Sequence, residues 1–155
     1  AISDRRVIPG NLGLCPTSLA ERIQGFHRPY HEALATLVNN AVVSHGRARL
    51  LSIHSFTPVW RGVMRDLEVG LLHAAPPDFL DMSYNLLRQA GYKVGINEPY
   101  DGALPGDCMD RHGLGKHPHM LIEIRNDLLQ NADWRAGFLI LLKKIDELME
   151  VDHDQ

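Results

Sequence analysis

The sequence predicts a single α/β domain over residues 1–155, built as a layered fold around a mixed sheet. Two observations predict this class. Short apolar segments alternate along the chain with amphipathic helical segments, which is the pattern of a layered α/β fold. The chain also has 155 residues, of which 45% are hydrophobic and 23% charged, which is enough apolar material for one core in an ordinary globular domain.

Residues 17–46 predict one long helix, or two helices in line, after an opening loop. Ser18 and Glu21 have the spacing of a capping box, and Gly46 is a plausible stop. Pro29 should kink or split the helix at about its first third. Apolar residues recur at helical spacing on one face: Leu19, Ile23, Phe26, Tyr30, Leu34, Leu37 and Ala41.

The rest of the chain predicts four strands and two helices. The expected strands are short apolar segments at residues 49–56, 67–73, 92–97 and 119–127. A helix is expected at residues 76–91, with prolines at its entrance and Gly91 at its end, and another at residues 134–151. Residues 98–118 are rich in Gly, Pro and Asp and show no periodicity. They predict a long loop, and such a loop in a compact domain is usually functional or disordered.

Charge and composition argue against nucleic-acid and membrane partners. The formal net charge is -3, which gives no basic footprint for nucleic acid, and no apolar run approaches the roughly 18 residues of a membrane span. We therefore expect a small-molecule partner, and the sequence leaves homo-oligomer formation open. Cys15 and Cys108 are far apart and form no CxxC motif, so we expect no disulfide framework or zinc knuckle, and a cytoplasmic location.

His54 stands at the end of the apolar segment "LLSIHSF", where polar residues begin. Strand ends are where α/β proteins bind ligands, so a functional role is one interpretation. The other is a hydrogen-bonded histidine at the rim of the core. Arg61 and Arg65 follow in the next loop, either as solvated charges or as a clamp for a carboxylate.

Glu123 lies between two isoleucines in the last predicted strand. With a side-chain period of two, it shares one face with His119, Leu121 and Arg125. A carboxylate on a buried strand is costly unless it is used or paired. Glu123 is therefore either half of a structural ion pair or a general base whose pKa is raised toward neutrality, so that it can take a proton from water.

Two pairs of residues point to sites only weakly. His27 and His31 are four residues apart in "HRPYH", as on a zinc-binding helix. The central glutamate of that motif is absent and Pro29 distorts the turn, so we interpret this pair as a decoy. Cys108 and His112 could act as a thiol nucleophile and its base, although no third partner is defined.

Two segments between the last predicted strands leave their role open. "NEPYDG", residues 97–102, begins where a strand stops. It is either a turn containing proline or a segment that presents the amide of Asn97 and the phenol of Tyr100 to a substrate. "DCMDRHGLGKHPH" offers two aspartates and three histidines, but its spacing matches no metal-binding loop.

Six segments, in this order and at these separations, resemble the N-formylglutamate amidohydrolase family: "PGN", "PYH", "IHSFTPVWRGVMRDLEVGLLH", "NEPYDG", "RHGLGKHPH" and "IEIRNDL". The resemblance covers nearly the whole chain. That family is similar in fold to the zinc carboxypeptidases, which implies a three-layer sandwich with a mixed sheet flanked by helices and a zinc ion at the strand ends. The implied function is zinc-dependent hydrolysis of the amide bond of an N-formyl or N-acyl amino acid such as N-formylglutamate, as in histidine degradation.

The resemblance also implies residue roles. In the carboxypeptidase pattern the last zinc-binding histidine stands in a strand-end "IHS", as His54 does here. The catalytic glutamate stands in a late strand before a hydrophobic residue and an arginine, as Glu123 does in "EIR". The implied substrate-binding residues are Arg61, Arg65 or Arg125 for the free carboxylates, and Asn97, Tyr100 and His112 for the acyl side.

The sequence departs from the family pattern in two places. Leu121 stands where members often have an acidic residue, and the chain opens at "AISDRRVIPGN", without the family segment that carries the first strand and the other metal ligands. We therefore expect the carboxyl-terminal part of such a domain, with the remaining zinc ligands upstream, or a lineage that has lost the site. The alternatives are a non-catalytic module that binds an acylated amino acid or a protein partner, and a thiol hydrolase that uses Cys108.

Overall fold

A four-stranded mixed sheet lies at the centre of the computed structural model, which describes residues 2–3, 6–103 and 105–150. β8 runs parallel to β3 and antiparallel to β6, and β6 runs parallel to β7. The predicted mixed sheet is therefore confirmed, and its strands match the four segments predicted from the sequence. In spatial order they are β3 (Leu50–Phe56), β8 (His119–Arg125), β6 (Val69–Leu72) and β7 (Val94–Ile96).

The register of the strands beside β8 determines which side chains meet. His54 on β3 pairs with Glu123 on β8, and Gly70 on β6 pairs with Glu123 from the other side. Because partners in register point to the same face of a sheet, the imidazole and the carboxylate project together. β8 is buried along nearly its whole length. The strand that carries the Glu123 carboxylate therefore lies in the interior of the sheet.

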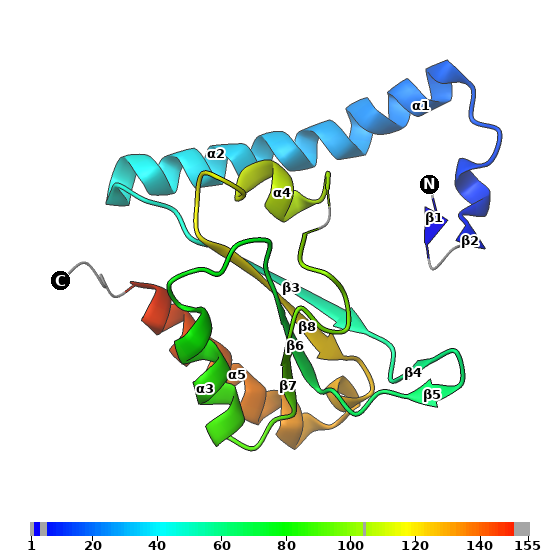
Figure 1. Ribbon diagram of the computed structural model, residues 1–155. Helices are drawn as coiled ribbons and strands as arrows, with labels where there is room; N and C mark the ends of the chain where they lie inside the picture. The colour runs from blue at the N-terminus through cyan, green and yellow to red at the C-terminus, as the bar shows by residue number, and fades with distance from the viewer. Residues whose placement is uncertain (1, 4–5, 104, 151–155) are drawn as a thin grey trace.

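α3 (Leu80–Gln89) and α5 (Ala132–Glu150) cover one face of the sheet, as Figure 1 shows. Ile122 and Leu71 point to this face and are fully buried. Burial of an aliphatic side chain of this size stabilises the fold by about 1.5–3 kcal/mol. The two helices match the segments predicted at 76–91 and 134–151, although residue 151 lies outside the described residues.

α2 (Arg28–His45) and α4 (Cys108–His112) lie on the other side of the sheet (Figure 1). A smaller core forms here, and it includes Leu121, which shares its face of β8 with Glu123. Helices on both sides of the sheet make the three predicted layers. The buried members of this second core are Ala48, Leu50, Leu72, Met109 and Leu121.

A long helical run precedes the sheet and extends beyond it in Figure 1. It consists of α1 (Pro16–Arg22), the π-helical turn η2 (Ile23–His27) and α2. Pro29 stands in the first turn of α2 and has no N–H to offer a carbonyl four residues back. The N–H of Arg28 bonds instead to the carbonyl of Ile23, five residues back. The predicted split at Pro29 is therefore wrong, because the run stays helical from Pro16 to His45 and contains a widened turn instead.

The sequence predicts how this helical run begins and how it ends. The predicted beginning is wrong, and the predicted end is confirmed. The capping box predicted at Ser18 is wrong, because Cys15 is the N-cap and its sulfur accepts the N–H of Ser18 at 3.4 Å. Pro16 then occupies the first helical position, which needs no N–H. Gly46 ends α2 as predicted, with a φ of 73° and its N–H bonded to the carbonyl of Val42.

Several short elements were not predicted from the sequence. Within the predicted long loop, α4 begins after Asp107, whose carboxylate accepts the N–H of Asp110 at 2.7 Å. After β3, β4 (Val59–Trp60) and β5 (Val63–Met64) form a hairpin. Its two turn residues, Arg61 and Gly62, both have positive φ, as a tight hairpin turn requires. The remaining elements are β1 (Ile2–Ser3), β2 (Arg6–Val7), η1 (Pro9–Asn11) and η3 (Leu128–Gln130).

The beginning of the loop after β7 packs closely against β6. A Cβ atom at Gly70 would lie 1.9 Å from the carbonyl oxygen of Glu98, so this approach requires glycine. The Asn97 side chain accepts the backbone N–H of His73 at 2.9 Å. A Cβ at Gly102 would lie 2.2 Å from the same backbone nitrogen. These contacts fix the path of the segment that carries Tyr100.

Candidate functional site

Glu123 is a buried carboxylate in the middle of the sheet. Its side chain is 7% exposed, and burial raises its pKa, while the charges of His54 and Arg65 act in the opposite direction. Its Oε2 atom is buried and has no hydrogen-bond partner among the described residues. An unpartnered buried carboxylate oxygen costs stability. This oxygen is also the atom of Glu123 that is free to accept a proton.

His54 stands beside this carboxylate at the solvent boundary. Its side chain is 57% exposed, and its Nδ1 atom lies 3.9 Å from Oε1 of Glu123. That separation is too long for a direct hydrogen bond. The imidazole is therefore close enough to influence the carboxylate, and its nitrogens are not both committed to the protein.

Arg65 brings a positive charge to the same site, from the segment between β5 and β6. It is half-buried, and its Nη1 atom donates to the carbonyl of Thr57 at 3.1 Å. Its guanidinium carbon lies 5.4 Å, 5.2 Å and 5.6 Å from the ring centres of Phe56, Trp60 and Tyr100. Aromatic faces attract a cation at such distances, so three rings hold Arg65 near Glu123.

The other two predicted arginines have different surroundings. Arg125 donates from Nε to Asp127 at 2.9 Å and from Nη1 to the carbonyl of Arg65 at 2.8 Å. Much of its donor capacity is thus used within the protein. Arg61 is exposed at the hairpin turn, 5.6 Å from the ring centre of Trp60. The substrate-binding role of all three arginines stays a prediction.

The residues expected on the acyl side are dispersed. Tyr100 lies at the site, beside Arg65. Asn97 is exposed, and its side-chain oxygen accepts the backbone N–H of His73. His112 lies on α4, where it contacts His31 of α2. The predicted residues that the structure brings together are therefore His54, Glu123, Arg65 and Tyr100.

A second group of chemically active side chains joins α2 to α4. His31 Nδ1 lies 2.8 Å from His112 Nε2, and Tyr30 Oη lies 3.3 Å from the sulfur of Cys108. Ligand atoms of His31, Cys108 and His112 all lie within 4.8 Å of one another. Burial is the largest of the causes that lower the pKa of His31 and of His112, and the nearby charge of Arg111 lowers both further.

The sequence indicates the members of this group only as two separate pairs of residues. His27 and His31 form one such pair and Cys108 and His112 the other, and nothing in their spacing joins one pair to the other. In the structure His31, and not His27, completes the group. The ring of His27 lies 4.4 Å from that of His31.

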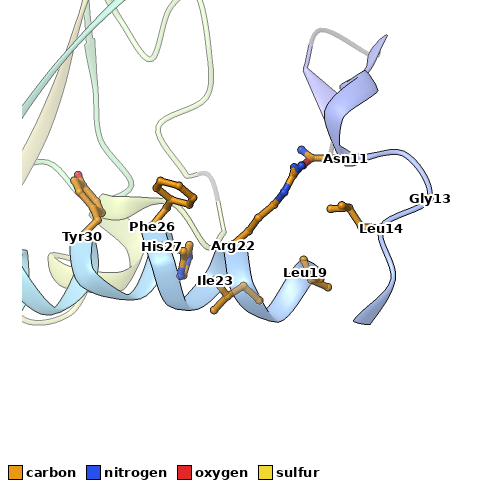
Figure 2. Close-up of a pocket in the computed structure, with 9 residues that line it drawn as sticks. All are labelled: Asn11, Gly13, Leu14, Leu19, Arg22, Ile23, Phe26, His27 and Tyr30. Atoms are coloured by element: carbon orange, nitrogen blue, oxygen red, sulfur yellow. The ribbon is translucent and has the colours of Figure 1, made fainter. Parts of the chain in front are cut away.

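An open hollow of about 940 Å³ lies next to the helical run. Figure 2 shows Arg22 extending from the helix toward Asn11, and its Nη1 atom lies 2.5 Å from the side-chain oxygen of that residue. The lining is largely apolar and includes Phe26 and Tyr30, but not His54 or Glu123. The hollow is therefore separate from the candidate site.

Comparison with known proteins identifies the family. A sequence model of the family described as N-formylglutamate amidohydrolase matches residues 1–130. The chain belongs to the N-formylglutamate amidohydrolase family. The match includes β3 and β8, and therefore both His54 and Glu123. The resemblance read from the six sequence segments is confirmed.

Two solved structures share the fold of this chain. A gene product from Agrobacterium tumefaciens is 30% identical with a TM-score of 0.78, over 97% of this chain and 62% of that protein. N-formylglutamate amidohydrolase from Ralstonia eutropha is 23% identical with a TM-score of 0.62, over 86% of this chain and 56% of that protein. At the lower identity the likeness concerns the fold alone. The chain thus spans less than two thirds of either solved protein.

No curated protein matches the sequence. Among the described residues, no helix combines the length and apolar character needed to cross a bilayer.

Proposed function

We propose that the chain contributes the base and part of the metal and substrate sites to an enzyme that hydrolyses the amide bond of an N-formyl or N-acyl amino acid such as N-formylglutamate. The observation that carries this proposal is the proximity of the exposed imidazole of His54 to the buried carboxylate of Glu123, whose Oε2 atom has no hydrogen-bond partner among the described residues. Membership of the N-formylglutamate amidohydrolase family supports it.

The residues at this site fit part of a catalytic zinc site. Such a site normally has three protein ligands and one open position. His54 offers an exposed imidazole, and the unpartnered oxygen of Glu123 gives a nearby water a proton acceptor. No group of three potential ligands that includes His54 is found in the described part of the chain. A complete zinc site therefore needs ligands in addition to His54.

Glu123 has the environment of a general base for hydrolysis. A base works best when its pKa lies near the operating pH, and burial moves the pKa of Glu123 in that direction. Glu123 would take a proton from the attacking water and then deliver it to the nitrogen of the leaving amino acid. A bound zinc ion would supply polarisation of the acyl carbonyl and acidification of the water.

Arg65 is the best-placed group for a substrate carboxylate. A guanidinium can bind a carboxylate through two parallel hydrogen bonds, and here the aromatic rings of Phe56, Trp60 and Tyr100 limit its motion. An amino acid held in this way would have its acylated nitrogen near Glu123. A small molecule of this kind is therefore the proposed partner, rather than nucleic acid or a membrane.

The proposal is tested by measuring formate release from N-formylglutamate by the complete enzyme to which this chain contributes, with the zinc-loaded enzyme compared with enzyme treated with a chelator. We expect turnover that chelation abolishes and added zinc restores. A thiol hydrolase that uses Cys108 would be indifferent to the chelator and would depend on Cys108 instead of Glu123. Turnover that persists without metal would therefore overturn the metal-dependent proposal.

One observation favours the alternative of a non-catalytic binding module, namely that the described residues place a single histidine ligand at the site. Such a module would keep Arg65 and its aromatic neighbours and would bind N-formylglutamate without consuming it. Calorimetry in the presence of zinc distinguishes the two functions. Binding without formate release would support the module.

A further inference from the structure

We propose that His31, Cys108 and His112 form a second metal site, which binds a borderline-soft divalent cation such as Zn²⁺. The three residues come from two helices that are distant in the sequence, α2 and α4. In Figure 1 α4 lies against α2. The site is separate from the one proposed at His54, and neither needs the other's ligands.

The donor set defines the class of metal. Two imidazole nitrogens and one thiolate suit zinc and related transition metals, whereas calcium and magnesium prefer oxygen ligands. Cys108 and His112 are four residues apart on α4, which places both side chains on one face of the helix. His31 of α2 faces them, and its ligand atom lies within 4.8 Å of both of theirs.

The spacing is close to that of a tetrahedral site. With bonds of about 2.0–2.1 Å to nitrogen and 2.3 Å to sulfur, two nitrogens and one sulfur around one tetrahedral zinc ion lie roughly 3.3–3.6 Å apart. The nitrogens of His31 and His112 are 2.8 Å apart, and all the ligand atoms are within 4.8 Å. Side-chain adjustments of about 1 Å or less would bring the three into position.

Two neighbours would support the bound ion. The hydroxyl of Tyr30 lies 3.3 Å from the sulfur of Cys108, where it can donate a hydrogen bond to the ligating thiolate. Such bonds to ligand atoms orient them and tune the metal. The three ligands are each only partly buried, so an ion could enter, and a water molecule could occupy the fourth position.

A metal ion at this site would link α2 to α4, two helices that are not strands of the sheet. His31 and His112 are separated by 81 positions, and α4 belongs to the long segment between β7 and β8. Metal binding to the folded chain would stabilise α4 against α2, because a ligand that binds only the native state favours that state.

The test is a titration of the chelator-treated full chain with Co²⁺, followed by its absorption spectrum. A cysteine thiolate bound to Co²⁺ gives a ligand-to-metal charge-transfer band in the near ultraviolet. We expect this band in the unaltered protein, and we expect Cys108→Ser to lose it. The absence of the band from the unaltered protein would overturn the proposal, whether or not any variant folds.

Matched variants assign the band to this site. Cys15→Ser replaces the other cysteine, which is exposed on the helical run, and should keep the band. His31→Gln and His112→Gln should each weaken Co²⁺ binding at least tenfold. A band that survives Cys108→Ser, or that Cys15→Ser alone removes, would contradict the proposal. His54→Ala should leave the band intact, so failure of the proposed hydrolytic site is distinguishable from failure of this one.

Discussion

His54 and Glu123 are register partners on the parallel strands β3 and β8, with 3.9 Å between Nδ1 and Oε1. The two side chains differ sharply in exposure, at 57% for the histidine and 7% for the glutamate. The pair therefore crosses the boundary between solvent and core. An exposed imidazole can bind a ligand there, while the buried carboxylate keeps a raised pKa.

Replacing Glu123 with glutamine should remove the general base while keeping the size of the side chain. A positioned base contributes about 10²–10⁴-fold to the rate, so we expect kcat for N-formylglutamate to fall by roughly that factor, with zinc content unchanged. Glu21→Gln, at an exposed position on α1, is the control. A rate for Glu123→Gln close to that of the control would remove Glu123 from the mechanism.

In the complete enzyme, His54→Ala should lower the tightly bound zinc by one equivalent, because the imidazole is the proposed ligand that this chain contributes to the site. The measurement is metal content by elemental analysis after dialysis of the protein. His45→Ala, which changes an exposed histidine at the end of α2, should retain the full amount. Equal zinc content in the two variants would show that His54 is not a ligand.

Arg65→Met should raise KM for N-formylglutamate more than kcat falls. Hydrogen bonds to a charged group are worth about 1.5–3 kcal/mol, which corresponds to an increase of roughly tenfold to hundredfold. Arg61→Met changes the exposed arginine of the hairpin turn, and Arg125→Met changes the arginine bonded to Asp127. If one of these two raises KM more than Arg65→Met does, the assignment of the carboxylate site is wrong.

Ile122→Ala should destabilise the protein by about 2–5 kcal/mol, since it opens a cavity in the larger core. Its register partner Ile53 lies on the same face of the sheet but is 45% exposed, whereas Ile122 is fully buried. Ile53→Ala should therefore cost about 1 kcal/mol or less. Urea unfolding of both variants measures the two losses in the free energy of unfolding. Equal losses would contradict the expectation that the more buried isoleucine contributes more.

His73 should make the fold less stable in mild acid. Both of its ring nitrogens are buried without a partner among the described residues, and its pKa is lowered first by burial and then by the charge of His119. Because the folded state favours the neutral ring, this contribution is complete above the unfolded pKa, about 6.5, and is lost as the pH falls toward the folded value.

His73→Leu should remove part of that pH dependence. The free energy of unfolding at about pH 7.5 and about pH 5.5 should differ less in this variant than in the unaltered protein. His45→Leu, at an exposed position, should keep the original difference. An unchanged difference in His73→Leu would show that His73 does not titrate on unfolding.

The sequence predicted the strands, both layers of helices and the alternating faces of β8, because these follow from local apolar periodicity. It did not predict that β8 lies between β3 and β6, since strand order depends on contacts between distant segments. α4 was missed because five residues show no periodicity, although Asp107 carries a recognisable N-cap signal.

Some residues of the candidate site could be predicted from the sequence, but most of their contacts could not, for similar reasons. Glu123 was recognised from its placement between isoleucines, and His54 from its place at the end of a strand, but their pairing came from the family resemblance. The aromatic surroundings of Arg65 depend on tertiary contacts. The meeting of His31 with Cys108 and His112 has no local signature at all.

The antiparallel direction of β6 relative to β8 decides which loops lie beside Glu123. The segments that follow β3 and β8 lie at the same end of the strands as the segment that precedes β6. The segment before β6 carries Arg65. Changes in the hairpin and in the approach to β6 would therefore alter the surroundings of the proposed substrate site, while the strand that carries Glu123 stays unchanged.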